Sequence, residues 1–169
     1  MWQTSFMKIS LPYLLLLLNF AVCNATAAHL LEGKVVSVAD GDTVTVLDDQ
    51  KEQHKIRLLG IDAPEKSQAF GEKSKQSLRD MVHGKTVQVT YAKRDKYGRI
   101  VGKVMLDDED ICHQQIKRGL AWHYKKYQNE QTPEDRDTYS ESENAARSQK
   151  LGLWTDAQPL APWDFRKGK

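Results

Sequence analysis

The sequence predicts a mainly β fold of the α+β class: a five-stranded Greek-key barrel of the OB type with about three helices. Five short segments with apolar residues at alternating positions, separated by turn residues, are typical of strands in a small barrel. A helical pattern follows the third segment, and two more follow the last one. This order, three strands, one helix, two strands and two helices, favours a single barrel with a helix plugging the sheet.

The first three strands are expected as a meander at residues 34–38, 43–46 and 54–61. Thr43-Val44-Thr45-Val46 alternates with the period of two that a strand requires. Tight turns at 40–42 and 48–51 connect the strands, because glycine tolerates positive φ and aspartate hydrogen-bonds its own backbone. Pro64 ends the third strand, since it lacks the N–H that a central ladder needs.

The remaining elements follow the same signals. A helix is predicted over residues 72–82, and strands are predicted at 86–91 and 100–106. Asp110 can cap a short helix that extends through Arg118. Thr132-Pro133-Glu134-Asp135 combines a capping residue, a first-turn proline and two acids, and therefore predicts the start of a helix that runs to about Lys150.

Length and composition limit the class of protein. The 169 residues are 40% apolar and 28% charged, which excludes collagen-like, low-complexity and wholly disordered chains and allows one domain with a tail. A formal charge of +2 excludes a globally basic nucleic-acid coat protein but permits a local basic site. Two cysteines cannot form a disulfide scaffold, and Cys112 is interpreted as a core residue rather than a reactive thiol.

The first 27 residues have the three-part pattern of a secretory signal peptide. Lys8 precedes an apolar run at 11–22, and Ala25-Thr26-Ala27 is a cleavage pattern. A membrane anchor is the alternative, but this run is shorter than the ~20 apolar residues that a span needs. Cys23 offers a second alternative, lipid attachment, against which the bulky Val22 argues. We therefore expect an exported protein, periplasmic or secreted, with no stable membrane span.

Four acids flank the first and third strands: Asp40, Asp42, Asp62 and Glu65. If the meander forms, they lie at one edge of the barrel, where a cation would relieve their repulsion. A set of oxygen ligands without histidine or cysteine favours Ca²⁺ or Mg²⁺ over zinc. The alternative is structural: Asp-Gly-Asp is only a turn, and Asp62 only a cap.

Two arginines strengthen the functional interpretation. Arg57 lies among apolar residues of the third strand, where an unpaired guanidinium is costly to bury, so it belongs either to a structural ion pair or to a polyanion site. Arg99 follows a turn that leads into the fifth strand. Arginines beside a carboxylate-bound divalent metal are what phosphoryl transfer requires, because both neutralise charge on the phosphate.

Three segments stand out by their order and spacing: Asp40-Gly41-Asp42-Thr43, Arg57-Leu58-Leu59-Gly60-Ile61-Asp62-Ala63-Pro64-Glu65 and Asp95-Lys96-Tyr97-Gly98-Arg99. They resemble the signature segments of the thermonucleases, the staphylococcal-nuclease-like family. The resemblance extends over residues 32–154. It implies an OB-type barrel that hydrolyses DNA and RNA with the help of Ca²⁺. Together with the N-terminal pattern, it predicts a signal peptide at 1–27 followed by a nuclease domain at 28–155. Residues 156–169 contain two prolines, little apolar periodicity and a basic end, and are therefore expected to form a loosely packed tail.

By matching position, the resemblance also implies roles for single residues. Asp42, Asp62 and the backbone carbonyl of Ala63 would ligate Ca²⁺, with Asp40 outside them. Glu65 would be the general base or the carboxylate that orients water. The phosphate would be bound and its transition state stabilised by Arg57 and Arg99, and the neighbouring phosphate contacted by Lys96 and Tyr97.

The chain departs from the best-known member of that family at two places. Ala63 stands where that member has threonine, so a carbonyl ligand is retained but a hydroxyl contact is lost. The loop at 66–71 is shorter. Farther along, Tyr124 and Tyr127 lie among basic residues and are candidates for base stacking, with ordinary packing as the alternative for Tyr127.

These observations predict an exported, Ca²⁺-dependent endonuclease that acts as a monomer on DNA and RNA with little sequence specificity. A non-catalytic OB module that binds nucleic acid is a second hypothesis, since a fold does not determine function. That hypothesis predicts loss of the acids and arginines, which are all present. A third hypothesis, an envelope-tethered protein that holds a partner, rests on Cys23 alone.

Overall fold

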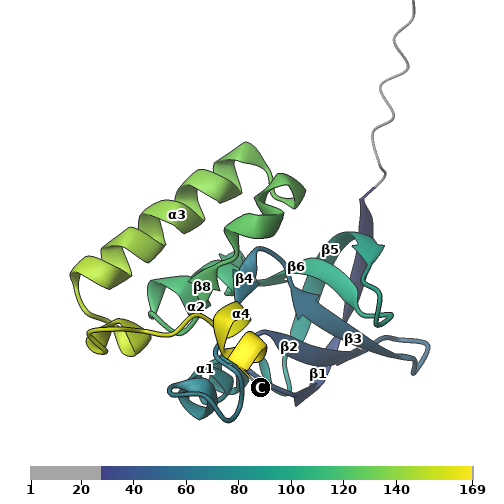
Figure 1. The fold of residues 1–169 in the computed structure, drawn as a ribbon. Coiled ribbons are helices and arrows are strands. Elements are labelled where there is room, and N and C mark those ends of the chain that lie inside the picture. Colours follow the sequence, from purple (N-terminus) through teal and green to yellow (C-terminus); the bar gives the residue numbers. More distant parts are fainter. Residues whose placement is uncertain (1–27, 169) are drawn as a thin grey trace, which may run out of the picture.

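The computed structural model describes residues 28–168 and confirms the predicted α+β barrel (Figure 1). Antiparallel pairing joins neighbouring strands in the order β3-β2-β1-β5-β6, and parallel pairing between β3 and β6 closes the sheet. The strands span His29–Val38 (β1), Thr43–Leu47 (β2), Gln53–Leu58 (β3), Thr86–Arg94 (β5) and Ile100–Leu106 (β6). The predicted signal peptide and Cys23 lie outside the described residues.

The barrel interior is filled by the apolar side chains that alternate along the strands. Fully buried members include Val35, Val44, Val46, Ile56, Leu58, Val87, Val89, Ile100 and Val104. Cys112 is also buried and free, which confirms its interpretation as a core residue. Such interdigitated burial is the main source of stability in a fold of this size, and it holds the strand ends in place.

The third predicted strand is interrupted in the structure, and the interruption positions a residue of the site. It was expected at 54–61, but β3 ends at Leu58 and the chain turns at Gly60, where φ is +75°. Glycine tolerates this backbone conformation, whereas other residues rarely adopt it. The turn starts a new strand, β4 (Ile61–Asp62), which pairs with β8 (Trp122–His123) in a second, two-stranded sheet. Asp62 therefore lies between the barrel and the helices.

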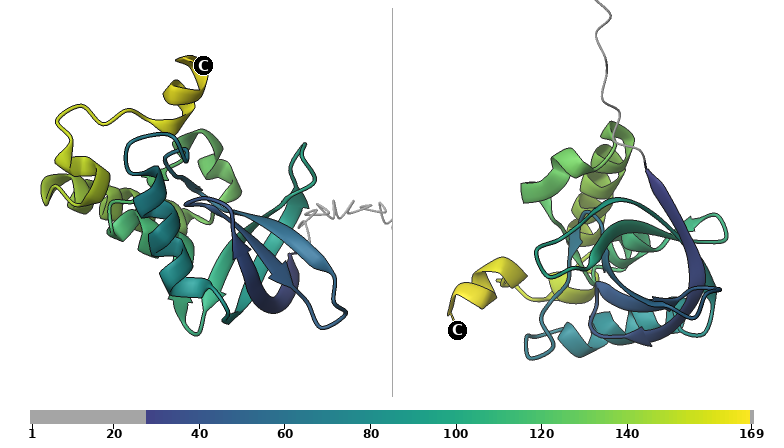
Figure 2. Two further views of the ribbon diagram at one scale, coloured as in Figure 1. Left: turned by 90° about the horizontal axis from the view of Figure 1, so that it is seen from below. Right: turned by 90° about the vertical axis from the view of Figure 1, so that its right-hand side faces the viewer.

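Three helices pack beside the barrel, as Figure 2 shows from two sides: α1 (Gly71–Val82), α2 (Ile111–Lys117) and α3 (Pro133–Ser148). The predicted caps are confirmed, since Asp110 accepts a hydrogen bond from the His113 N–H and Thr132 accepts one from the Asp135 N–H. A strand of two residues, β7 (Glu109–Asp110), pairs with the end of β6, and a 3-10 helix occupies Lys125–Glu130.

The C-terminal residues are packed more closely than the predicted loose tail at 156–169. A 3-10 turn at Gly152–Thr155 is followed by the one-turn helix α4 (Pro162–Phe165) and a 3-10 turn at Arg166–Gly168. A second apolar cluster joins this segment to the helices: Trp122, Ala146, Leu153, Trp154 and Ala161, with Phe70 and Trp163 against it. Within residues 28–168, no helix combines the length and apolar character needed to cross a membrane.

Candidate active site

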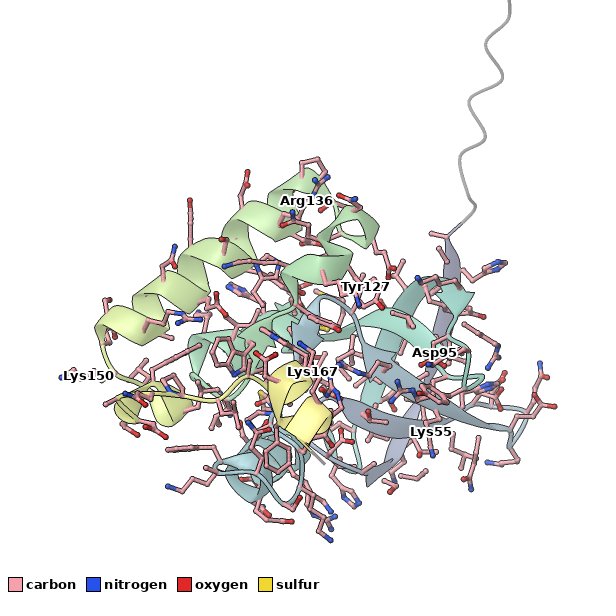
Figure 3. All side chains as sticks on the ribbon, viewed as in Figure 1. Lys55, Asp95, Tyr127, Arg136, Lys150 and Lys167 are labelled. Carbon is pink, nitrogen blue, oxygen red and sulfur yellow. The ribbon has the colours of Figure 1, made fainter. Side chains whose placement is uncertain are left out.

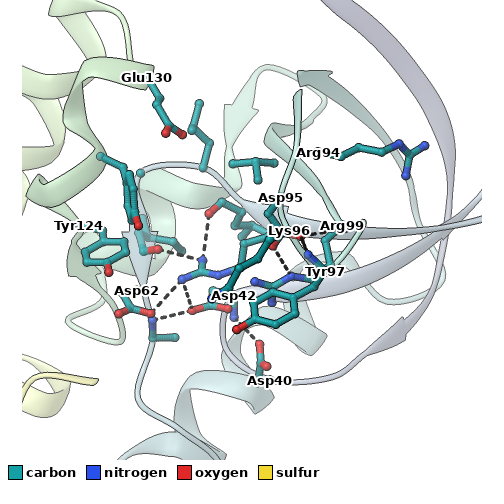
Figure 4. Close-up of a pocket in the computed structure, with 18 of the residues that line it drawn as sticks. Asp40, Asp42, Asp62, Arg94, Asp95, Lys96, Tyr97, Arg99, Tyr124 and Glu130 are labelled. Atoms are coloured by element: carbon teal, nitrogen blue, oxygen red, sulfur yellow. Dashed lines mark hydrogen bonds and ion pairs between the residues drawn. The ribbon is translucent and has the colours of Figure 1, made fainter. Parts of the chain in front are cut away.

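One cavity of about 690 Å³ opens where β3 and β4 meet the β5–β6 hairpin. In Figure 4, Asp42, Asp62, Tyr97, Arg99 and Tyr124 lie around a common space, whereas Arg94 points away from it. All the site residues predicted from the sequence line it: Asp40, Asp42, Arg57, Asp62, Ala63, Glu65, Lys96, Tyr97, Arg99 and Tyr124. The fold thus brings together residues that are spread over more than eighty positions of the chain.

Asp42 is held in the turn that precedes β2. Its buried Oδ2 accepts a hydrogen bond of 2.7 Å from the Ala63 N–H, and its Oδ1 accepts one of 3.0 Å from the Thr43 hydroxyl. Asp40 braces the turn, since its Oδ1 accepts a 3.1 Å hydrogen bond from the Asp42 N–H. From behind, the buried Gln115 amide donates to the Gly41 carbonyl at 2.8 Å. Gln115 is a supporting residue that the sequence did not reveal.

Arg57 joins the two buried aspartates. Its Nη2 lies 2.8 Å from Asp62 Oδ1 and 3.2 Å from Asp42 Oδ2. Its Nη1 donates to the carbonyls of Leu58 and Ile61 at 3.0 and 2.9 Å. The two interpretations of Arg57, as a member of an ion pair and as part of a polyanion site, are therefore compatible. Its guanidinium pairs with both aspartates and also faces the cavity.

Burial has the largest effect on the pKa values of these groups. Burial raises the pKa of Asp42 from 3.8 to about 6, although the neighbouring Arg57 acts in the opposite direction. Burial likewise raises the pKa of Asp62. Burial opposes the charge of Arg57, but Asp42 and Asp62 outweigh it and raise the pKa of the guanidinium. Two carboxylates with raised pKa values form a site that an additional cation would stabilise.

The donor set fits a hard divalent cation. Asp42 and Asp62 present carboxylate oxygens on the same cavity, and Ala63 and Glu65 line it beside them. Oxygen donors of this kind are the preferred ligands of Ca²⁺ and Mg²⁺. The raised pKa values of both aspartates agree with a site that binds a further cation in addition to Arg57.

Arg99 reaches the cavity from the β5–β6 hairpin. Asp95 Oδ1 accepts from the N–H groups of Tyr97 and Arg99, which fixes the turn, and Asp95 Oδ2 accepts from Arg99 Nε at 2.8 Å. Gly98 has a φ of +79°, which allows the tight reversal. Tyr97 is 72% exposed at the tip, and the Arg99 guanidinium lies 5.6 Å from its ring centre. Arg99 is therefore a half-buried cation that lines the cavity, and its ion pair within residues 28–168 is with Asp95.

Aromatic rings border the other side of the cavity. Tyr124 stacks on Trp163 with ring centres 5.4 Å apart and planes inclined by 10°. Tyr127, which is 44% exposed, meets Tyr124 edge to face at 5.1 Å. Tyr127 thus belongs to the surface rather than to the core, and Lys93 and Lys126 lie over its ring.

Arg166 is the site residue that the sequence did not reveal. Its Nη2 lies 2.7 Å from Asp62 Oδ2, and its Nη1 lies 2.7 Å from Glu65 Oε1. Glu65 is also held by Gln68, whose side-chain carbonyl accepts from the Glu65 N–H at 3.1 Å. Trp163 and Phe165 lie next to Arg166 in the sequence, and aromatic residues favour a packed segment over a loose tail. These two residues are the sequence signal that could have indicated a packed C-terminal segment.

A second group of possible ligands lies elsewhere in the described chain. Ligand atoms of Asp48, Glu52 and His54, around the β2–β3 turn, lie within 4.8 Å of one another. None of the three lines the cavity. His54 Nε2 pairs with Asp48 Oδ2 at 2.7 Å, which closes the turn and accounts for the cluster without a metal.

Comparisons with known proteins agree with this geometry. Residues 55–156 match the family described as "Staphylococcal nuclease homologue". The chain is 40% identical over 164 residues to a protein named "Uncharacterized endonuclease" from Escherichia coli, covering 96% of this chain and 100% of that protein. A protein of the same name from Haemophilus influenzae is 38% identical over 152 residues, covering 90% and 82%. "Micrococcal nuclease" from Shigella flexneri is 38% identical over 144 residues, covering 80% of each chain. The chain belongs to the staphylococcal nuclease family.

Proposed function

We propose that this chain is an exported, Ca²⁺-dependent endonuclease that hydrolyses phosphodiester bonds of DNA and RNA with little sequence specificity. The observation that supports this most strongly is the shared cavity, in which two buried aspartates lie beside Arg57, Glu65 and Arg99. The names of the relatives, endonuclease and micrococcal nuclease, support the same reaction class.

In this proposal Asp42, Asp62 and the Ala63 carbonyl hold Ca²⁺, which supplies positive charge to the phosphate when it is bound. Glu65 orients the attacking water and accepts its proton. The water oxygen would form the new bond to phosphorus while the bond to the leaving oxygen breaks, and the leaving oxygen would take up a proton from an arginine or from solvent. Arg57 and Arg99 bind the phosphate oxygens from two sides, where charge develops in the transition state.

The proposed substrate range follows from what the cavity can recognise. Lys96 and Arg99 offer charge to phosphates, and the rings of Tyr97 and Tyr124 offer stacking faces. Neither type of contact reads the edges of bases, and phosphate contacts carry no sequence information. Both DNA and RNA present these groups, so a chain with this cavity cleaves both and discriminates weakly between sequences.

Export is proposed from residues 1–27, whose pattern is that of a secretory signal. The site itself contains no cysteine, and Cys112 is buried in the core, so an oxidising environment leaves the proposed chemistry intact. The proposed location is the periplasm or the medium. We propose that the protein acts as a monomer, since Asp42, Arg57, Asp62, Glu65 and Arg99 of one chain line one cavity and supply the proposed site without a second copy.

A gel assay of the purified protein on DNA and RNA, with Ca²⁺ or with excess chelator, tests the proposal. We expect a broad ladder of products from both substrates with Ca²⁺ and no cleavage with chelator. The Asp42→Asn variant is the control for contaminating nuclease, because it removes the charge of one proposed ligand. A discrete, sequence-defined set of products would contradict the proposed lack of specificity.

A further inference from the structure

The C-terminal residues 161–168, here called the strap, run across the edge of the active-site cavity. Ala161 and Pro162 are buried, and the Trp163 ring packs edge to face on Trp122 with centres 5.4 Å apart. The Gln68 amide donates to the Leu160 carbonyl at 2.6 Å just before the strap. Figure 3 shows Lys167 of this segment in front of the junction between barrel and helices. The strap is thus docked at its beginning by Ala161, Pro162 and Trp163.

Arg166 places a cation on the proposed metal ligand and on the proposed base. Its two terminal nitrogens lie 2.7 and 3.3 Å from the oxygens of Asp62, and one of them lies 2.7 Å from Glu65 Oε1. Hydrogen bonds to Asp62 and Glu65, together with their charge, raise the pKa of Arg166. A carboxylate whose two oxygens both accept from guanidinium groups has little capacity left for a metal ion.

Trp163 covers the ring proposed for base stacking. Its indole lies parallel to the Tyr124 ring, with centres 5.4 Å apart and planes inclined by 10°. An unpaired base would use the same kind of offset parallel contact. Trp163 therefore covers an aromatic face that a substrate base would otherwise contact. Arg166, three residues later, pairs with two acids that a metal ion would otherwise contact.

Resting on the proposed function, we infer that the strap is an autoinhibitory element that competes with Ca²⁺ and nucleic acid for the active site. Arg166 leaves Asp62 when Ca²⁺ binds, because Ca²⁺ would take the Asp62 oxygens that accept from Arg166. The attachment suits a reversible element, because the Arg166 side chain is 42% exposed and residues 155–158, which lead to the strap, are exposed. The Arg166 guanidinium is partly exposed, so water and salt screen its ion pairs, and the strap gates the site rather than sealing it.

Calorimetric titration of Ca²⁺ into the metal-free, full-length chain tests this inference with a readout other than activity. The Arg166→Gln variant should bind Ca²⁺ about 10-fold more tightly than the unmodified chain. In this variant Ca²⁺ no longer has to displace Arg166 from Asp62 before it binds. Lys167→Gln is the matched control: it makes the same charge change one position away, at a side chain that pairs only with Asp164 among the described residues. That variant should remain within about 2-fold.

Cleavage by chymotrypsin after Trp163 or Phe165, followed by mass spectrometry, reports the position of the strap without any metal. We expect faster cleavage in Arg166→Gln than in Lys167→Gln, and faster cleavage of the unmodified chain when Ca²⁺ is added. Unchanged or weaker Ca²⁺ binding by Arg166→Gln would overturn the inference and make Arg166 an organiser of the site. If no variant binds Ca²⁺, the proposed calcium dependence fails. Proteolysis then tests the position of the strap without reference to Ca²⁺. Equal cleavage rates in Arg166→Gln and Lys167→Gln would overturn the inference.

Discussion

Arg57 and Asp62 are five residues apart, yet the Arg57 Nη2 and Asp62 Oδ1 atoms lie 2.8 Å from each other because the chain turns sharply at Gly60. This turn returns the chain alongside the arginine and carries Asp62 to the pocket that also holds Asp42. A continuous strand through residue 61 would have extended the two side chains along different parts of one ladder. The interruption of the strand is therefore what assembles the charged centre.

Arg99→Ala should lower the cleavage rate by about 10²–10³, since it removes a cation from the developing charge on phosphate. The fold should survive, because the Arg99–Asp95 pair at the hairpin is partly exposed and such pairs contribute less than about 1 kcal/mol. Single-turnover cleavage and thermal unfolding measure the two effects. Arg118→Ala, the same change at an exposed arginine outside the cavity, serves as the control. Wild-type cleavage by folded Arg99→Ala would show that Arg99 has no role in the reaction.

Arg57→Ala should differ from Arg99→Ala in its effect on stability. It leaves Asp42 and Asp62 buried without their shared partner, and breaking a buried pair typically costs about 3 kcal/mol of unfolding free energy. Urea unfolding of both variants in chelator gives the comparison. Equal stability of the two variants would mean that the Arg57 pairs contribute no more than a surface ion pair.

Glu65→Gln should reduce kcat by at least about 10² while Ca²⁺ and nucleotide still bind, because the amide retains the shape but cannot accept the proton. A purely structural role through Arg57 is not supported, since the ion pair of Glu65 among the described residues is with Arg166. Turnover and calorimetric Ca²⁺ affinity are measured on the same sample, with Glu141→Gln on the exposed side of α3 as the control. A folded Gln variant that cleaves at the parental rate would rule out the proposed role.

The pKa of Asp42 predicts an unusual pH dependence for the metal-free protein. With a folded value of about 6 and an ordinary value of 3.8, the folded state holds a proton that the unfolded chain releases at lower pH. The stabilisation is complete below about pH 4 and is lost as the pH rises through 6, by up to about 1.4 kcal/mol per pH unit. In urea unfolding with chelator, Asp42→Asn should lack this decline. The same slope in both proteins would indicate that Asp42 is ionised throughout.

Nucleic-acid binding should weaken steeply with salt, because cations of the cavity neutralise phosphates and release counterions. Fluorescence anisotropy of a labelled single strand with the Glu65→Gln variant should show about a 10-fold loss between 50 and 200 mM salt. Lys96→Gln should reduce the slope of this dependence by about one contact. An affinity that does not change with salt would contradict a site directed at phosphates.

Much of the site could be predicted because its residues occur in short segments with strong local signals. Asp40-Gly41-Asp42 has the residues of a tight turn, and the alternation that follows it predicts the strand at Thr43–Leu47. Gly60 indicates that the strand is irregular at this position. A single glycine within an apolar run does not, however, determine whether the strand bends or ends there. The roles assigned to the individual residues stay predictions until variants are measured.

Contacts between distant segments could not be predicted from the same signals. Arg166 meets Glu65 across 101 positions, and no periodic pattern relates the 3-10 turn at Arg166–Gly168 to the loop before α1. Gln115 supports the Gly41 carbonyl from α2, where a glutamine looks like any polar residue on a helix face. Both contacts depend on how the elements pack, which follows from the whole core rather than from any one segment.

Cleavage measured against free Ca²⁺ on chelator-treated protein tests the central claim most directly. Rates are followed on single-stranded DNA while Ca²⁺ binding is determined by calorimetry on the same preparation. We predict that cleavage rises from zero with a midpoint at the measured dissociation constant. Mg²⁺ should support little turnover, since its strict octahedral geometry suits this site less well. Full cleavage in excess chelator, or saturation of cleavage far below the Ca²⁺ dissociation constant, would contradict a reaction that depends on a metal held by Asp42 and Asp62.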